Sequence, residues 1–273
     1  MMAAMATMPA SAFRPIGAQD PPVGEAPAAH ELREVMGLRY WDVEPVRAAR
    51  FLVNEAVANR RLQIFFVNAH CVNVAARQPA YARVLEHSPF LFAAGAGMAL
   101  AARLSGTSLK HNVNGTDLFP LLCSAAAAAA VPIAFLGARP GVAGACAARM
   151  EREHPGLKVV WVADGFLTAA QEQQRLQELQ ASKAQLLFVA KGVPAQEHWI
   201  AAHAGKLSVP VVLGVGALFD FYSGTIRRAP LFMRRLRLEW LYRLLREPRR
   251  LFGRYVLGNP LFVARVLLWR LRH

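Results

Sequence analysis

The stretch P-I-A-F-L-G-A-R-P-G-V-A-G-A-C-A-A-R-M-E-R-E-H-P-G-L-K-V-V-W-V-A-D-G, residues 132–165, decides the fold of this chain. An apolar run of strand length at 132–136 leads into a glycine-containing turn at 137–141, and a segment with helical spacing follows at 142–153. A second apolar run occupies 157–162. A strand, a crossover helix and a second strand in this order are typical of a parallel β-sheet.

The same alternation extends from this unit in both directions. We expect further strands at 62–67, 90–93, 185–190 and 209–215. We expect helices at 43–59, 71–86, 168–182 and 194–204, and others that begin near Met98 and Asp117. The pattern predicts an α/β fold, in which helices cover both faces of a mainly parallel sheet. At 273 residues and 55% hydrophobic composition, the chain is long enough to bury such a core.

Chemistry is expected in the loops that follow the strands, because ligands bind beyond the carboxyl ends of parallel strands. These loops hold glycines and polar side chains, namely Asn68, His70, Gly95, Gly97, Gly137, Gly141, Asp164, Gln196, Glu197 and Asp220. In the turn 137–141, glycine would let backbone N–H groups approach a phosphate at the start of a helix. A tight turn without a ligand is the alternative, because the turn lacks the spacing of the Walker and G-x-G-x-x-G motifs.

The last fifty residues are both basic and apolar. Residues 224–273 contain thirteen Arg, no Lys and two acids, which is a net charge of +11 out of +14 for the whole chain. A guanidinium grips a phosphate through two hydrogen bonds, and Leu and aromatic residues recur here at helical spacing. We therefore predict an amphipathic helical arm over 224–273 that binds a diphosphate or an anionic membrane surface. A solvated basic helix that caps the domain is the alternative.

The remaining segments set the boundaries of the molecule. Residues 1–30, rich in Ala, Pro and Gly, predict a flexible leader, so that the α/β core covers 31–223. No window offers the roughly 18 apolar residues of a spanning helix. Because Pro260 and Arg265 interrupt 257–269, we expect that segment to lie on a membrane or to pack, not to cross. Three cysteines without metal-ligand spacing, and an N-terminus without a secretory pattern, predict a cytoplasmic location.

Four short motifs follow one another in the second half of the chain. They are G-V-P-A-Q-E at 192–197, G-V-G-A-L-F-D at 214–220, R-A-P at 228–230 and L-E-W-L-Y-R-L-L-R-E-P-R-R at 238–250. Each motif is modest by itself, but the set in this order is specific. It resembles the WecG/TagA/CpsF family of glycosyltransferases, and the similarity covers roughly residues 45–262.

The resemblance implies a Rossmann-like fold and inverting transfer of a hexose or N-acetylhexosamine-type sugar. The donor would be a UDP-sugar and the acceptor a polyprenyl-diphosphate-linked sugar. Such bacterial enzymes build exopolysaccharides and other surface polymers, and the resemblance implies a peripheral protein on the inner face of the plasma membrane that self-associates into a homo-oligomer. It also implies no metal and no other cofactor, and the five Asp residues of the chain form no D-x-D pair to hold a cation.

The family motifs assign roles to particular residues. Gln196, Glu197 and Asp220 fall on motif positions, and together with Asn68, Gly137 and Gly141 they are the expected nucleotide-sugar site. The C-terminal arginines of the family would bind the donor or acceptor diphosphate, and they fall here on Arg228, Arg243, Arg250 and Arg254. For Glu197 the alternative is an acid stabilised by the first turn of a helix, and for each arginine it is a solvated surface position.

The chain departs from the family pattern at the expected general base. The pattern reads Asp-Gly after the second strand, whereas this chain has Ala94, which cannot accept a proton. An Arg that precedes Gly-x-Asp-Leu in the pattern is also missing from N-V-N-G-T-D-L at 112–118. His70 and Asp117 are the candidate replacement bases. A diverged, catalytically weak homologue that acts as a binding partner in polysaccharide assembly is the alternative.

A nucleic-acid-binding protein is the other class that the charge suggests. A sequence pI near 10.8 and an arginine-rich arm could bind phosphate backbones. No recognised nucleic-acid module accompanies this charge, however, and the apolar residues of the arm favour a membrane. We therefore expect no nucleic-acid partner.

Overall fold

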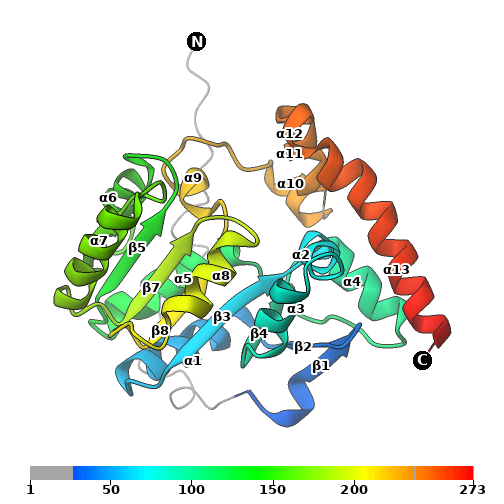
Figure 1. Ribbon diagram of the computed structural model, residues 1–273, viewed down its shortest axis with the longest axis horizontal. Helices are drawn as coiled ribbons and strands as arrows, with labels where there is room; N and C mark the ends of the chain where they lie inside the picture. The colour runs from blue at the N-terminus through cyan, green and yellow to red at the C-terminus, as the bar shows by residue number, and fades with distance from the viewer. Residues whose placement is uncertain (1–26, 237, 273) are drawn as a thin grey trace.

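The computed structural model describes residues 27–236 and 238–272. They form an eight-stranded sheet in the order β1-β2-β4-β3-β8-β7-β5-β6 (Figure 1). β1 and β2 pair antiparallel, and every other neighbouring pair is parallel. The strands are β1 Leu32–Val35, β2 Leu38–Trp41, β3 Leu62–Val67, β4 Phe90–Ala93, β5 Ile133–Gly137, β6 Val159–Ala163, β7 Leu186–Ala190 and β8 Val211–Gly214. The predicted Rossmann-like, mainly parallel α/β architecture is confirmed.

Helices cover both faces of this sheet. One face carries α1 Pro45–Val57, α5 Gly115–Ala128, α6 Val142–Glu153 and α9 Leu218–Tyr222. The other face carries α2 Ala69–Ala75, α3 Pro79–Glu86, α4 Gly95–Leu104, α7 Ala169–Ala181 and α8 Ala195–His203. Two separate apolar cores result, one on each side of the sheet.

The central strands are buried on both faces, which explains their continuous apolar runs. In β5 and β7, Phe135 and Phe188 point into the first core, where their rings pack edge to face with centroids 5.6 Å apart. The next residues along these strands, Leu136 and Val189, point into the second core. Alternation within an apolar run therefore fills two layers at once.

The arm consists of short helices that end in one long helix. Its elements are α10 Leu231–Arg235, α11 Glu239–Arg246, α12 Pro248–Phe252, a π-helical segment Gly253–Leu257 and α13 Gly258–Arg272. Figure 1 shows the chain leaving α9 and crossing to α10, after which α13 runs beside α2 and α4. Phe262 and Val266 of α13 are buried in the second core. Asn73 of α2 donates to the carbonyl oxygen of Gly258 (2.7 Å) and accepts from Arg265 (2.6 Å).

Several local expectations need correction. The helix expected at 71–86 is two helices, because Pro79 begins α3 and residues 76–78 separate it from α2. The helix expected near Met98 begins at Gly95, directly after β4. The hairpin of β1 and β2 was not expected, since each strand has only four residues and mixes charged with apolar side chains.

The expectation that no segment is long and apolar enough for a spanning helix is wrong, whereas the expectation that 257–269 packs agrees with the burial of Phe262 and Val266. Pro248–Arg272 is one continuous helical stretch of 25 residues, long and apolar enough to cross a membrane by length and composition alone. A proline cannot donate to the carbonyl four residues earlier, but Pro260 lies near the start of α13, directly after the π-helical turn Gly253–Leu257, and the helical stretch continues through it. Only 17% of the tested window is buried inside the protein. The first 26 residues of the predicted leader lie outside the described residues.

Candidate active site

The carboxyl ends of β3, β8, β7 and β5 are consecutive in the sheet, so the loops that follow them share one edge. Gln196 and Glu197, after β7, are only 3% and 1% exposed. Gln196 Oε1 accepts from the backbone N–H of Gly216 (2.8 Å), and its Nε2 donates to Glu197 Oε1 (2.9 Å). Gln196 therefore ties the loop after β7 to the loop after β8.

Glu197 is a buried carboxyl group with an unsatisfied oxygen. Its Oε2 has no hydrogen-bond partner among the described residues. Burial raises the pKa of Glu197 to about 7, although the hydrogen bond from Gln196 favours the ionised form. Gln196 and Glu197 are thus buried at this edge of the sheet, and their contact with a nucleotide-sugar stays a prediction.

The turn after β5 is fixed by close backbone contacts. Gly137 has φ +132°, and a Cβ atom there would lie 2.4 Å from the carbonyl oxygen of Ala190 at the end of β7. Gly141, at φ +80°, is the N-cap of α6. The N–H of Gly165, after β6, donates to Ala138 O (2.9 Å). Both predicted glycines thus belong to a rigid turn whose neighbours are the loops after β7 and β6.

Asp220, in α9 after β8, faces a cluster of arginines. Its charged neighbours are Arg139 from the turn after β5, and Arg243, Arg250 and the acidic Glu247 from the arm. Burial raises the pKa of Asp220, and these guanidinium groups partly oppose the rise. Arg243 also lies over the ring of Phe221, 5.4 Å from its centroid. Two of the four predicted arm arginines therefore converge on a predicted donor-site carboxylate.

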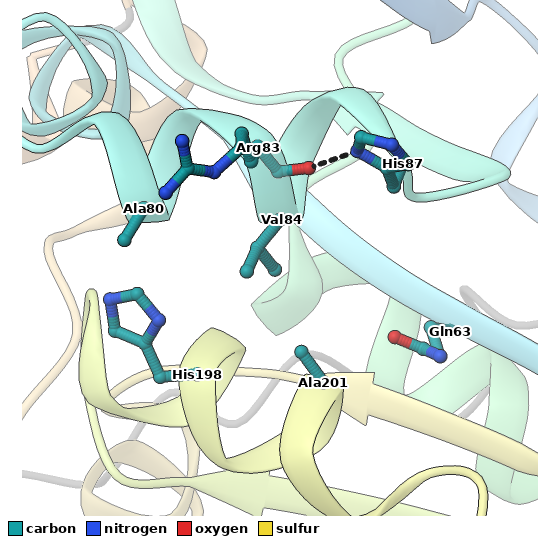
Figure 2. A pocket seen from close by; sticks show the side chains of 7 residues that line it. All are labelled: Gln63, Ala80, Arg83, Val84, His87, His198 and Ala201. Carbon is teal, nitrogen blue, oxygen red and sulfur yellow. Dashed lines mark hydrogen bonds between the residues drawn. The ribbon is translucent and has the colours of Figure 1, made fainter.

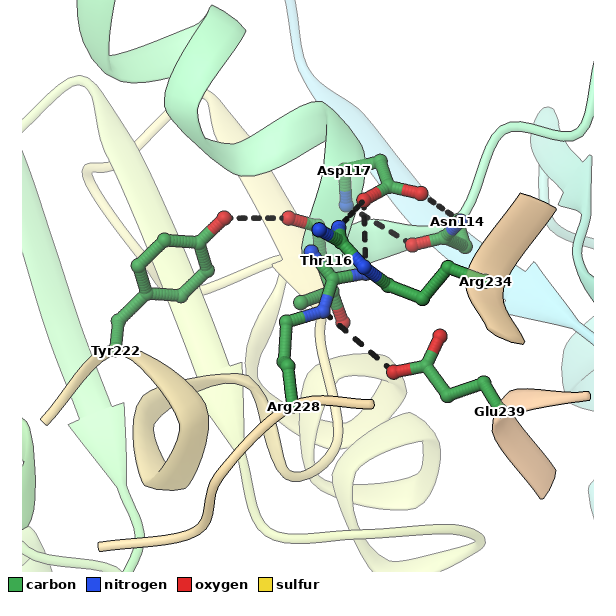
Figure 3. Close-up of polar contacts among 7 residues, drawn as sticks. All are labelled: Asn114, Thr116, Asp117, Tyr222, Arg228, Arg234 and Glu239. Carbon is green, nitrogen blue, oxygen red and sulfur yellow. Dashed lines mark hydrogen bonds and ion pairs between the residues drawn. The ribbon is translucent and has the colours of Figure 1, made fainter. Parts of the chain in front are cut away.

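Asp117, at the start of α5, binds a different part of the arm (Figure 3). Its Oδ1 lies 2.8 Å from Arg228 Nη2 and 3.8 Å from Arg234 Nη1. Its Oδ2 accepts from the side-chain amide of Asn114 (2.7 Å). Arg228 also pairs with Glu239 (3.5 Å). Asp117 therefore anchors the arm to the core.

His70 lies in the first turn of α2, directly after β3. The N-cap side chain of Asn68 accepts from the backbone N–H groups of His70 (2.9 Å) and Cys71 (3.3 Å). The imidazole is half-buried, and its ring has no hydrogen bond or ion pair with the part of the chain that the structure describes. Burial lowers the pKa of His70 to about 4, and the nearby Arg254 and Arg77 contribute to this shift.

The predicted residues thus form three groups along one edge. Asp220 lies with Arg243 and Arg250, Asp117 with Arg228, and His70 with Arg254. Within 27–236 and 238–272, no cluster of three or more His, Cys, Asp or Glu side chains could hold a metal ion.

Comparison with known proteins gives a consistent result. The sequence model of the glycosyl transferase WecG/TagA/CpsF family matches residues 33–273. Similar proteins from Bacillus spizizenii (33% identity, covering 71% of this chain and 74% of the relative) and Bacillus subtilis (31%, 74% and 77%) are each named N-acetylglucosaminyldiphosphoundecaprenol N-acetyl-beta-D-mannosaminyltransferase. A protein of the same name from Staphylococcus aureus is 26% identical, with 79% and 83% covered. The chain belongs to the WecG/TagA/CpsF family. It is a glycosyltransferase, and the family match includes the whole arm.

Within this glycosyltransferase, the departure at Ala94 is accommodated without distortion. Ala94 is buried as the N-cap of α4, and its N–H donates to Val67 O at the end of β3 (2.8 Å). The next N–H, that of Gly95, donates to Asn112 Oδ1 (2.7 Å). A neutral amide therefore satisfies the start of α4, in the segment that lacks the Arg of the family pattern.

Sequence reasoning did not assign roles to three of the polar residues at this edge. Arg139 is a charged neighbour of Asp220, Arg234 forms an ion pair with Asp117, and Asn112 accepts from the N–H of Gly95. The position of Arg139 in the loop after a strand was a usable signal. Arg234 and Asn112 gave none, because their partners lie far away in the sequence.

A pocket elsewhere on the glycosyltransferase surface takes no part in this edge. It measures about 470 Å³ between α3 and α8, and its lining includes Gln63, Arg83 and His198 (Figure 2). Gln63 is at the amino-terminal end of β3, remote from the loops described above. No predicted site residue lines this pocket.

Proposed function

We propose that this glycosyltransferase moves a hexose or N-acetylhexosamine-type sugar from a UDP-sugar to a polyprenyl-diphosphate-linked sugar, with inversion at the anomeric carbon. The reaction would take place on the cytoplasmic face of the membrane, in assembly of an exopolysaccharide or another surface polymer. The relatives' names contain an undecaprenyl-diphosphate-linked acceptor, and they support this choice.

The observation that carries the proposal is the set of arm arginines with unused donors. The buried Nε atoms of Arg234, Arg243 and Arg254 have no hydrogen-bond partner among the described residues. An unpaired buried donor is costly, and phosphate oxygens are its natural acceptors. A donor or acceptor diphosphate between the arm and the sheet edge would satisfy these groups. It would also let guanidinium groups stabilise the leaving diphosphate without a metal.

The donor would lie over the loops after β5, β7 and β8. The rigid turn at Gly137 and Gly141 offers backbone donors at the start of α6. Arg139 belongs to that turn and Asp220 is its charged neighbour in α9, and together they would supply groups for a diphosphate and for sugar hydroxyls.

The outer surface of the arm suits an anionic membrane. Exposed large apolar side chains are concentrated there, namely Phe232, Leu236, Leu245, Phe252, Val256, Leu257, Leu261, Leu267, Leu268 and Leu271. Arginines alternate with them along the helices, as in interfacial helices that bind acidic lipids. The acceptor lipid would then reach the site from the bilayer beneath the arm. Truncation after Ser223 is expected to abolish binding to anionic vesicles while the α/β core stays folded, and vesicle binding by the truncated chain would contradict this.

The deciding experiment is acceptor-dependent UDP release by the full-length protein. A panel of UDP-sugars would be incubated in detergent with polyprenyl-diphosphate-linked N-acetylglucosamine or glucose. Release that requires both substrates supports the proposal and names the donor. No release with any pair, although UDP binds in calorimetry, would refute it. That result would favour a catalytically weak homologue that binds partners in polysaccharide assembly, the function that the missing acid at Ala94 supports.

A further inference from the structure

We propose that His70 is the general base of this enzyme and takes the proton of the acceptor hydroxyl, in place of the carboxylate that is absent at Ala94. The inference rests on the proposed function. It distinguishes His70 from Asp117 on the contacts that each side chain makes.

The backbone brings His70 and Ala94 to adjacent loops. β3 and β4 are neighbours, Val67 is in register with Ala93, and the N–H of Ala94 donates to Val67 O (2.8 Å). The first turns of α2 and α4 then leave the sheet in contact, since a Cβ atom at Gly97 would lie 2.9 Å from Ala69 Cβ. A base on the first turn of α2 therefore stands beside the loop where the family pattern has its acid.

The imidazole of His70 has no partner among the described residues, whereas the carboxylate of Asp117, although 50% exposed, is held by three partners. Both carboxylate oxygens of Asp117 are engaged, Oδ1 by Arg228 and Arg234 and Oδ2 by Asn114. An acceptor hydroxyl would have to displace these partners. The half-buried imidazole of His70 has no hydrogen bond or ion pair within the described ranges, and Asn68 fixes only its backbone.

Burial, together with two nearby charges, keeps the imidazole of His70 neutral. Burial is the larger cause of the lowering of the His70 pKa to about 4, and Arg254 from the π-helical turn of the arm and Arg77 from the loop after α2 add to it. The ring is then unprotonated at neutral pH, as a base must be. Its proton affinity is close to that of an ordinary Asp, which has a pKa of about 3.9. A neutral base also adds no negative charge next to the diphosphates.

The transfer step balances without any further reactant. The acceptor hydroxyl oxygen attacks the anomeric carbon of the donor while its proton passes to an unprotonated nitrogen of His70. The bond from the anomeric carbon to the β-phosphate oxygen breaks, and its electron pair stays on the departing UDP. Arg254, which faces His70, is in position to bind the released diphosphate charge. The imidazolium then returns its proton to solvent.

The test compares four proteins in the UDP-release assay, namely wild type, His70→Ala, Ala94→Asp and the double variant. We expect His70→Ala to lower kcat by roughly 100-fold to 10,000-fold and to change the Kd for UDP less than about threefold. The double variant should have a kcat at least about tenfold higher than that of His70→Ala, because Ala94→Asp supplies a carboxylate in the adjacent loop. His87→Gln is the matched control, since His87 is exposed and bonds only the Arg83 carbonyl oxygen.

The pH profile separates a base from a structural histidine when wild type is compared with His70→Ala. Wild-type kcat/KM should fall at low pH as His70 becomes protonated, with a pKa of about 4, and His70→Ala should lose this acid limb. An acid limb of the same shape in His70→Ala would contradict the proposal. So would His70→Ala with activity near wild type, or a double variant that stays inactive although Ala94→Asp alone is active. If wild type releases no UDP, the proposed function fails first and this inference fails with it.

Discussion

Replacement of Phe262 by Ala is expected to release α13 from the core. The Phe262 ring is 1% exposed, and its Cε1 would lie 3.5 Å from a Cβ atom at Gly97 of α4. Other attachments of α13 include the buried Val266, the partly buried Val263 and the hydrogen bonds to Asn73 and to the Leu104 carbonyl oxygen. Truncation of a buried Phe costs about 3–5 kcal/mol. Each of these hydrogen bonds contributes only about 1 kcal/mol. We therefore expect Phe262 to be the largest single contributor among these contacts.

A loss of about 3–5 kcal/mol shifts the docking equilibrium by roughly two to three and a half orders of magnitude. Hydrogen–deuterium exchange without detergent should show amides of 258–272 exchanging at least about 100-fold faster, while those of β7 keep their protection. Leu268→Ala is the control, because that side chain is 54% exposed and its removal should leave exchange unchanged. Unaltered protection of α13 in Phe262→Ala would refute the assignment of docking energy to this ring.

Three further predictions concern the core and the anchor of the arm. Glu197→Gln keeps the acceptor for Gln196 and removes a carboxyl whose pKa rises from 4.5 to about 7 on folding. Between these two pKa values the folded wild type binds more protons than the unfolded chain, so its free energy of unfolding should fall as pH rises from 4.5 to 7. Relative to the variant, the fall should reach up to about 3 kcal/mol, measured by urea denaturation at each pH. Gly137→Ala should destabilise the core by about 3 kcal/mol or more in the same assay, because its Cβ would lie 2.4 Å from Ala190 O. Asp117→Asn should weaken two ion pairs and raise hydrogen exchange over 225–239 roughly fivefold, an effect that should diminish at high salt.

Each of these outcomes has a control that the chain supplies. Gly144→Ala, at a helical glycine with open space around it, should be neutral or slightly stabilising where Gly137→Ala is not. Equal pH slopes for wild type and Glu197→Gln would show that Glu197 ionises freely in the folded state. Unchanged exchange over 225–239 in Asp117→Asn would mean that the ion pairs do not hold the arm.

The strands were predictable because they are buried on both faces. β3, β4 and the helix α6 have the predicted bounds, since an apolar run or a helical period is a local property of the sequence. The hairpin of β1 and β2 was not predictable in the same way. β1 is mostly half-exposed and includes Arg33 and Glu34, so that its stability comes from pairing with β2 at the edge of a sheet formed later in the chain.

The candidate site was predictable in its location and only partly in its composition. Loops after strands gave Gln196, Glu197 and Asp220, because the topology of a parallel sheet brings strand ends together. The burial of Gln196 and Glu197 could not be predicted, since it depends on the hydrogen bond to Gly216 in another loop. The arm helices were predictable as a basic and apolar segment. Their attachment to the core, through Asn73 of α2 and Phe262 of α13, was not predictable.

The sequence by itself determined the α/β architecture, the basic arm, the family and the absence of an acid at Ala94, because periodicity, charge and motifs are local properties of the sequence. Only the tertiary structure decided what each polar side chain can do. His70 and Asp117 were equivalent candidates in the sequence, and contacts with residues more than 100 positions away separate them. Asp117 forms ion pairs with Arg228 and Arg234, whereas the imidazole of His70 has no hydrogen bond or ion pair with the described residues. The physical reason is that the partners and the burial of a side chain depend on residues far away in the sequence, which only the folded chain brings together.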